Sequence, residues 1–320
     1  MEFSFSRREP RRHAASHWLM TAIGCCLCAS LSACGSTGSS GRATSGRLVI
    51  ATAFYPLQWV TQQVGGARVA ASSVTRAGAE PHDLELTPHD VATVLDADLV
   101  VYLRGFQAAM DDAVTKADSD KVLDVAGAAR LDLRTSPADD QRSNASSVAD
   151  PHFWLDPTRM ADVASTVAGS LARIDPSNAS TYTSNANELG AQLRTLDHEY
   201  SVGLANCRIR DLVTSHAAFG YLARHYGFDQ VGIAGLSPET EPSSATMSSV
   251  SDLVRRRHVT TIYFETLTSP DVARTLAAET GASTAQLDPI EGLTAKSNGR
   301  DYLAVMRSNL ATLRTSQGCP

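Results

Sequence analysis

The sequence predicts an α/β fold with two similar lobes, whose sheets are largely parallel and which one long helix joins. In both halves of the 320-residue chain, strand-like apolar runs alternate with helical patterns, and this alternation is typical of βα units. Between the halves, residues 157–174 predict the joining helix because their apolar side chains recur at helical spacing. These side chains are Met160, Val163, Val167 and Leu171.

Each half predicts four strands. Those of the first half are residues 47–54, 69–74, 98–103 and 121–126, with helices at 56–66 and 87–97 between them. Those of the second half are residues 210–216, 230–236, 260–266 and 282–289, with helices at 217–227 and 247–258. A further helix at residues 179–204 leads into the second half, and the polar stretch 135–150 is expected to be an exposed loop.

The N-terminus has the layout of a secretory signal. Four arginines precede an apolar stretch at residues 18–31, which is too short to cross a bilayer comfortably. The following "LSAC" resembles a bacterial lipobox, in which Cys34 would carry lipid and become the mature N-terminus. An ordinary signal peptide with an incidental cysteine is the alternative. We expect an extracytoplasmic protein that is attached to the cell membrane by its lipid, since no later segment is apolar enough to be a transmembrane helix.

These features give an expected domain organisation. The segments are a signal peptide (1–33), a flexible tether (34–47), an N-terminal lobe (48–156), a linking helix (157–174) and a C-terminal lobe (175–320).

Charge and cysteine content narrow the class further. The formal net charge is −6, so nothing indicates a nucleic-acid partner. Once the signal is removed and Cys34 is lipidated, only Cys207 and Cys319 remain. Two cysteines in an oxidising compartment favour a disulfide that ties the C-terminal tail to its lobe, with two unpaired thiols as the alternative.

Three histidines stand out by position. His82 follows a proline just before a helix, His152 lies between two Asp-Pro steps in a stiff, extended loop, and His216 ends a strand. In open α/β sheets, ligands bind outside the carboxyl ends of strands, so the fold could assemble these three into one site. Taken singly, a histidine in such a position is more often a structural or surface residue than a ligand. Four other histidines lie on predicted helices or at their ends and are expected to be solvated: His89, His198, His225 and His258.

Six motifs in order carry a family resemblance: "EPHDLELTP", "DPHFWLDP", "TSHAAFGYLARHYGF", "GLSPETEPS", "YFE" and "LDPIEGLT". Together they resemble the metal-binding lipoproteins, or solute-binding proteins, of bacterial zinc and manganese ABC importers, over roughly residues 48–315. The resemblance implies two α/β lobes, a rigid linking helix and a metal in the cleft between the lobes. It also implies a non-enzymatic, monomeric protein that captures a metal ion and delivers it to an ABC permease and its ATPase.

Carried over residue by residue, the family's three histidine ligands fall on His82, His152 and His216. The fourth ligand falls on Glu291, with Asp288 as the competing carboxylate. Three imidazoles and one carboxylate suit tetrahedral Zn²⁺, whereas manganese prefers more oxygen ligands. The resemblance therefore implies Zn²⁺ as the transported ligand.

The surroundings of this implied site follow from the same motifs. Phe153 and Trp154 would shield the metal from water. Glu265 and Glu241 stand at family-like positions near the cleft, but helix capping or surface exposure is at least as plausible for each.

Other readings of the sequence remain open. A surface adhesin of the same fold, with metal as a structural element, is the main alternative. A zinc hydrolase would need an open coordination position and a nearby base, and the motifs supply neither. The chain departs from zinc-type relatives in residues 135–150, which hold Asp139, Asp140 and Asp150 but none of the histidines that a metal-gathering loop carries.

Overall fold

The computed structural model describes residues 46–135 and 148–320. The predicted signal peptide, Cys34, most of the tether and the loop residues Asp139 and Asp140 lie outside the described residues. No helix of the described part is both long and apolar enough to cross a membrane.

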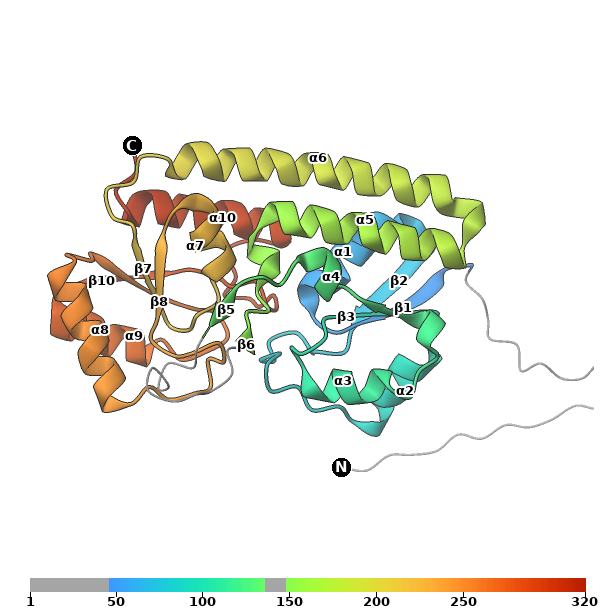
Figure 1. Ribbon diagram of the computed structural model, residues 1–320, viewed down its shortest axis with the longest axis horizontal. Helices are drawn as coiled ribbons and strands as arrows, with labels where there is room; N and C mark the ends of the chain where they lie inside the picture. The colour runs from blue at the N-terminus through green and yellow to red at the C-terminus, as the bar shows by residue number, and fades with distance from the viewer. Residues whose placement is uncertain (1–45, 136–147) are drawn as a thin grey trace, which may run out of the picture. The chain divides into compact units, whose positions relative to one another are not determined.

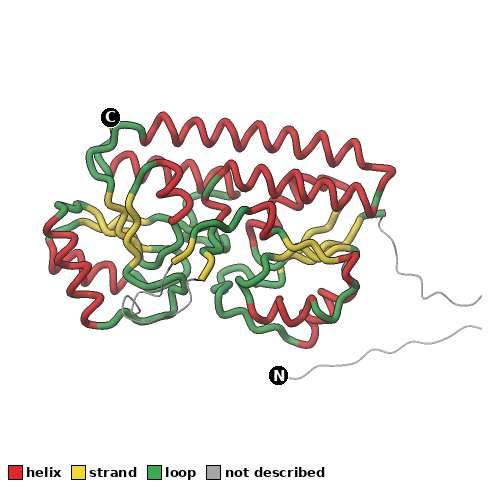
Figure 2. The backbone as a smooth tube through the Cα atoms, viewed as in Figure 1, coloured by secondary structure: helices red, strands yellow, loops and turns green. Residues whose placement is uncertain are grey.

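Two four-stranded parallel sheets, one in each half of the chain, form the framework (Figure 2). The first sheet has the order β2-β1-β3-β4 and the second β10-β9-β7-β8, with every pair parallel. The first set is β1 (Leu48–Thr52), β2 (Val69–Ser73), β3 (Leu99–Tyr102) and β4 (Val122–Asp124). The second set is β7 (Asp211–Thr214), β8 (Asp229–Gly232), β9 (Thr261–Phe264) and β10 (Ser283–Gln286). Counted from its own first strand, each sheet has the same order, so the prediction of two similar α/β lobes is confirmed.

Helices follow the strands in both lobes (Figure 1). The first lobe has α1 (Tyr55–Gly65), α2 (Pro88–Asp96), α3 (Ala108–Val114) and α4 (Ala126–Ala129), with the short 3-10 helices η1 (Gly66–Arg68) and η2 (Ser119–Lys121). The second has α7 (Gly220–Tyr226), α8 (Ser244–Arg256), α9 (Asp271–Thr280) and α10 (Tyr302–Ser316). The central strand β3 is buried at all four residues and continuously apolar, because both faces of a parallel sheet are covered.

Two long helices connect the lobes. α5 (Pro157–Ile174) starts at Asp156, whose side chain accepts a hydrogen bond from Thr158 N, with a proline at the first helical position. After the turn η4 (Pro176–Asn178), α6 (Ala179–Leu204) runs back along α5. α6 contacts α1 of the first lobe and α10 of the second, and Figure 1 shows it passing along both. The helix α6 therefore packs on both lobes and is a support that they share.

The core reflects this support. One large cluster of buried apolar side chains runs from the first sheet through α5 and α6 to α10, and includes Val100, Val163 and Leu193. A smaller cluster, including Ile262 and Leu276, fills the space between the second sheet and helices α8 and α9. A disulfide joins Cys207, after α6, to Cys319, after α10.

The segment predicted as an exposed loop at residues 135–150 is only partly described. Its ends form a short antiparallel ribbon, β5 (Arg134–Thr135) with β6 (Val148–Ala149), and Asp150 is buried. The expectation of exposure is therefore wrong for Asp150. Each strand of the ribbon has only two residues, which is too short for an alternating pattern to reveal it.

The extended loop predicted around His152 also differs in detail. Between the two Asp-Pro steps the chain makes one turn of 3-10 helix, η3 (Phe153–Leu155). A proline restricts only the residue directly before it, and Asp156 is indeed extended. The residues between the prolines are free to turn.

Candidate metal centre

The site lies where the second sheet's middle strands end. His216 follows the last residue of β7 by two positions, and Glu265 directly follows β9. β7 and β9 are neighbours, but the chain leaves them toward opposite edges of the sheet. Loops diverge at such a point and leave a crevice, where open α/β sheets bind ligands.

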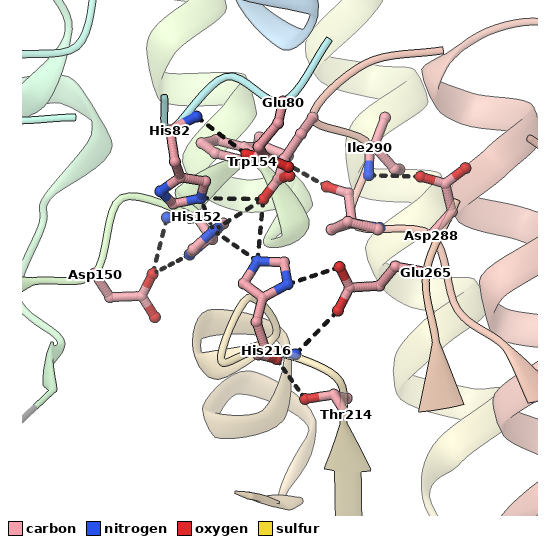
Figure 3. A network of polar contacts seen from close by, with 12 residues as sticks. Glu80, His82, Asp150, His152, Trp154, Thr214, His216, Glu265, Asp288 and Ile290 are labelled. Atoms are coloured by element: carbon pink, nitrogen blue, oxygen red, sulfur yellow. Dashed lines mark hydrogen bonds and ion pairs between the residues drawn. The ribbon is translucent and has the colours of Figure 1, made fainter. Parts of the chain in front are cut away.

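Four side chains from both lobes converge in this region (Figure 3). His82 comes from the β2–α2 connection, His152 from the segment before α5, His216 from the end of β7, and Glu291 from the β10–α10 connection. Each offers one ligand atom, and these atoms all lie within 4.8 Å of one another. His152, His216 and Glu291 are buried, and His82 is nearly so.

The separations of these atoms fit one tetrahedral ion. His152 Nε2 lies 3.2 Å from His82 Nε2 and 3.4 Å from His216 Nε2. Glu291 Oε1 lies 3.4, 3.1 and 3.2 Å from the Nε2 atoms of His82, His152 and His216. A tetrahedron with metal–ligand bonds of about 2.0–2.1 Å has edges of about 3.3 Å. The four atoms therefore already stand at the spacing of a four-coordinate shell.

Two carboxylates orient two of the imidazoles. Asp150 Oδ1 accepts from His152 Nδ1 at 2.7 Å and from His152 N at 2.9 Å. Glu265 Oε2 accepts from His216 Nδ1 at 2.7 Å, and Glu265 Oε1 from His216 N at 3.1 Å. When Nδ1–H donates to a carboxylate, the lone pair on Nε2 is left for a metal, and the ring cannot rotate freely.

His82 is held differently. Its main-chain N donates to Glu80 Oε1 at 3.0 Å, and its ring lies edge-on to Phe106 with centroids 4.7 Å apart. Phe106 also packs on Phe54, and both rings pack on Trp154. Trp154 in turn lies 5.2 Å from the His152 ring, so an aromatic wall closes the first-lobe side of the site. Sequence analysis anticipated Trp154 in this wall but missed Phe54 and Phe106.

The same wall is tied to the second lobe. Trp154 Nε1 donates to the carbonyl of Pro289 at 2.7 Å, and Tyr302 donates to the carbonyl of Trp154. Phe153 is fully buried and packs edge-on against Trp154. It backs the wall through this contact with Trp154.

The two competing carboxylates of the last motif have different surroundings. Glu291 Oε1 faces the three imidazoles, whereas Asp288 Oδ1 accepts from Ile290 N at 2.8 Å. Ile290 has φ = 58°, a left-handed conformation that is costly for a β-branched residue. Asp288 thus stabilises a strained turn, and that turn aims Glu291 into the site.

Charges within the site are balanced for a cation. Burial acts to raise the pKa of Glu291, but His216 first and then the other two imidazoles hold it well below its usual range. Burial acts to lower the pKa of His216, yet Glu265 and Glu291 raise it well above 6.5. The pKa of His152 is likewise raised, with Asp150 overcoming burial, while burial lowers that of His82. A metal ion would therefore find an ionised carboxylate but would compete with protons for two of the imidazoles.

The other glutamates and histidines considered from the sequence differ in their burial. Glu265 is buried against His216, whereas Glu241 is exposed. His89, His198 and His258 are exposed, as expected. His225 is also exposed as a residue, but its ring lies between Asp156 (3.0 Å) and Asp197 (3.1 Å), which sequence analysis did not foresee.

Asp150 is the functional residue that sequence reasoning missed most clearly. The sequence placed it in a polar loop, yet it supports His152 directly. The available signal was its position two residues before the histidine, where an Asp-Pro step lets the side chain fold back onto the following main chain.

Comparisons with known proteins find zinc-binding proteins that match most of the chain. The family profile described as "ZnuA: Zinc-uptake complex component A periplasmic" matches residues 50–316. The zinc-binding protein AdcA of Streptococcus pyogenes is 35% identical over 287 residues, which cover 84% of this chain and 56% of AdcA. The chain thus spans little more than half the length of that relative. The high-affinity zinc uptake system protein ZnuA of Bacillus subtilis is 33% identical over 297 residues, which cover 89% of this chain and 93% of the relative.

A solved structure shows the same fold. The laminin-binding protein Lmb of Streptococcus agalactiae, described as a bifunctional protein with adhesin and metal-transporting activity, superposes with a TM-score of 0.74 at 31% identity. The match covers 84% of this chain and 99% of Lmb.

Proposed function

Because the chain belongs to the family of periplasmic zinc-uptake components A, we propose that it captures Zn²⁺ outside the cytoplasmic membrane for import. The observation that carries the proposal is the group of four ligand atoms, three imidazole nitrogens and one carboxylate oxygen, held 3.1–3.4 Å apart along five edges. Such a nitrogen-rich, four-coordinate shell suits Zn²⁺ better than Mn²⁺. His82, His152, His216 and Glu291 are the proposed ligands.

Delivery is the second part of the proposal. A binding component needs a partner that moves the ion across the membrane, so an ABC permease with its ATPase would receive the zinc. The chain itself would be non-enzymatic, because four protein ligands fill a tetrahedral shell and leave no position for a reacting water. It would act as a monomer, since all four proposed ligands come from one chain.

The proposed location depends on the N-terminal sequence. Residues 1–33 would be removed as a signal peptide, Cys34 would carry lipid, and residues 34–47 would tether the protein to the membrane surface. The lobes would then comprise residues 48–156 and 175–320, with residues 157–174 between them.

Metal analysis tests the function directly. Protein purified without added metal should contain zinc by elemental analysis. After chelation it should bind one Zn²⁺ per chain, far more tightly than Mn²⁺, in competition with a chromophoric chelator. A stoichiometry of zero or a preference for manganese would overturn the proposal.

An adhesin is the second candidate, and the likeness to Lmb favours it. In that case the metal would be a structural element of a surface protein. Deleting the gene separates the two functions. A zinc importer predicts a growth defect that added zinc rescues, whereas an adhesin predicts lost attachment to laminin with normal growth in low zinc.

A further inference from the structure

Tyr221, in the first turn of α7, has a hydroxyl placed at the end of the β5–β6 ribbon. It donates to the main-chain carbonyl of Asp150 at 3.1 Å and accepts from the main-chain N of Leu133 at 3.3 Å. The tyrosine is buried, with 1% of its surface exposed. It therefore joins two segments of the first half of the chain from a helix of the second half.

The ribbon shows what the hydroxyl replaces. Arg134 pairs with Ala149, so Leu133 and Asp150 form the next antiparallel pair. Asp150 N donates to Leu133 O at 2.9 Å, as in a hydrogen-bonded pair, which would normally exchange a second bond in the other direction. The Tyr221 hydroxyl bridges the two partners of that second bond. The strands are thereby spread at Asp150, one residue before the chain turns toward His152.

Neighbouring residues fix the tyrosine. The guanidinium groups of Arg159 and Arg224 lie 4.4 and 5.3 Å from the centre of its ring. Arg159 is itself held by Asp156 and by the carbonyl of Ala129. The ring thus has a restrained position from which its hydroxyl can locate the Asp150 main chain.

The helix start is also shaped to fit Asp150. A Cβ added at Gly220 would lie 2.6 Å from Asp150 Oδ2 and 2.5 Å from Leu133 Cδ2. Glycine therefore allows α7 to approach the carboxylate that orients His152. His216 lies four residues before Gly220. One short segment therefore carries the proposed ligand His216 and also packs against Asp150, which orients the proposed ligand His152.

We propose that Tyr221 is a positioning residue for the metal site, which sets the direction of His152 by locating the Asp150 main chain and carboxylate. The inference rests on the proposed function, because its consequence is read in zinc affinity. This contact also couples the positions of His152 and His216, since a shift of α7 would move both His216 and the residues that support His152.

A hydroxyl deletion tests the inference. Tyr221→Phe should weaken Zn²⁺ about threefold to tenfold, which is below the roughly 10–100-fold loss typical of a group that contacts a ligand itself. Tyr200→Phe is the matched control, because Tyr200 is equally buried and donates to the carbonyl of Met306, away from the site. Both variants should lower the melting temperature after chelation, but only Tyr221→Phe should weaken zinc binding or alter the visible spectrum of bound Co²⁺.

A double-mutant cycle tests the route. If Tyr221 acts through Asp150, then adding Tyr221→Phe to Asp150→Ala should weaken zinc by less than about twofold further. Asp150→Asn replaces Asp150→Ala if the latter does not fold. Full additivity, or wild-type affinity in Tyr221→Phe, would overturn the inference while leaving the proposed function intact. A wild-type protein that does not bind zinc would overturn both.

Discussion

The two lobes share one backbone plan and differ in what they present at its edge. In the first lobe, Ala53 N donates to the carbonyl of Val101, and in the second, Ser215 N donates to that of Tyr263. Because both sheets have the same strand order, these bonds mark equivalent positions. One residue further, Phe54 stands where the second lobe has His216. Two residues beyond Val101 and Tyr263, Leu103 stands where the second lobe has Glu265.

The two lobes therefore share their strand topology but differ in the side chains at the carboxyl ends of the strands. The shared strand order leaves a crevice at the carboxyl ends of the middle strands in both lobes. Only the second lobe places a ligand and its orienting carboxylate there. The first lobe instead places Phe54 in the aromatic wall and sends His82 from a longer connection. The second-lobe edge thus supplies His216 and its carboxylate partner, whereas the first-lobe edge supplies part of the aromatic wall.

The largest loss of zinc affinity is predicted for a change at Glu291, a ligand that the second lobe supplies. Glu291→Ala removes the carboxylate that faces three imidazoles. Losing one partner of a buried charged pair costs about 3–5 kcal/mol, or roughly two to three and a half orders of magnitude in affinity. Chelator competition would measure the loss, and thermal melts after chelation would show that the protein still folds.

Asp288→Ala is the control for that variant. Asp288 contacts the Ile290 main chain, so its loss should lower stability while weakening zinc much less than Glu291→Ala. If Asp288→Ala abolishes binding and Glu291→Ala does not, the fourth ligand is Asp288.

The lobes also differ in covalent crosslinking, because within the described residues the disulfide lies on the second-lobe side. A second variant tests what this crosslink contributes. Replacing Cys207 and Cys319 by serine should lower the free energy of unfolding by about 2–4 kcal/mol, as expected for a crosslink that closes a long loop. Urea denaturation measures this change. Zinc affinity should be unaffected, since Cys207 follows the end of α6, Cys319 follows the end of α10, and neither belongs to the group of four ligands. An unchanged stability, or free thiols in the exported protein, would contradict the prediction.

Sequence patterns were sufficient for the parallel sheets because continuous apolar runs and helical periodicity are local signals. β1 and β7 were both found within two residues of their observed ends. The same reasoning placed three histidines at strand ends or loops, but the motif resemblance was needed to join them and to add Glu291. Separation along the chain gives no local sign that His82 and Glu291 will meet.

Supporting residues were harder to predict for a physical reason. Asp150 and Phe106 lie in segments whose local sequence is compatible with an exposed loop, and only tertiary contacts reveal their burial. Glu265 could equally have been solvated, and its role depends on β7 and β9 being neighbours. Orientation of a ligand by a residue from another strand is a property of the assembled sheet.

A third, smaller effect sharpens the comparison between the two oriented imidazoles. Asp150→Asn and Glu265→Gln each weaken a carboxylate–histidine contact of 2.7 Å. Each should weaken zinc about 10–100-fold. Glu241→Gln, at an exposed glutamate, is the control and should bind normally. Chelator competition checks all three, and wild-type affinity in either of the first two would show that its imidazole needs no carboxylate partner.

The smallest predicted effect concerns a polar contact between the lobes and their helical support. His225 of α7 lies between Asp156, at the start of α5, and Asp197 of α6. The hydrogen bond that His225 donates to Asp156 raises the pKa of His225, against the effect of burial, and the charges of both aspartates act in the same direction. Arg159 opposes the shift, and the ring stacks on Tyr226 at 4.5 Å.

The sign of the pH dependence follows from this raised pKa. A histidine whose pKa is higher in the folded protein contributes its full stabilisation below about pH 6.5, its unfolded value, and loses it as the pH rises through the folded pKa. His225→Gln should therefore destabilise the protein by about 1 kcal/mol at pH 6 and by less at pH 8.5. Urea denaturation with EDTA present measures both, and taking the difference between wild type and variant cancels the site histidines. A difference that grows with pH would mean that His225 acts as a neutral hydrogen-bonding group, and that the contact between α7 and the long helices does not depend on charge.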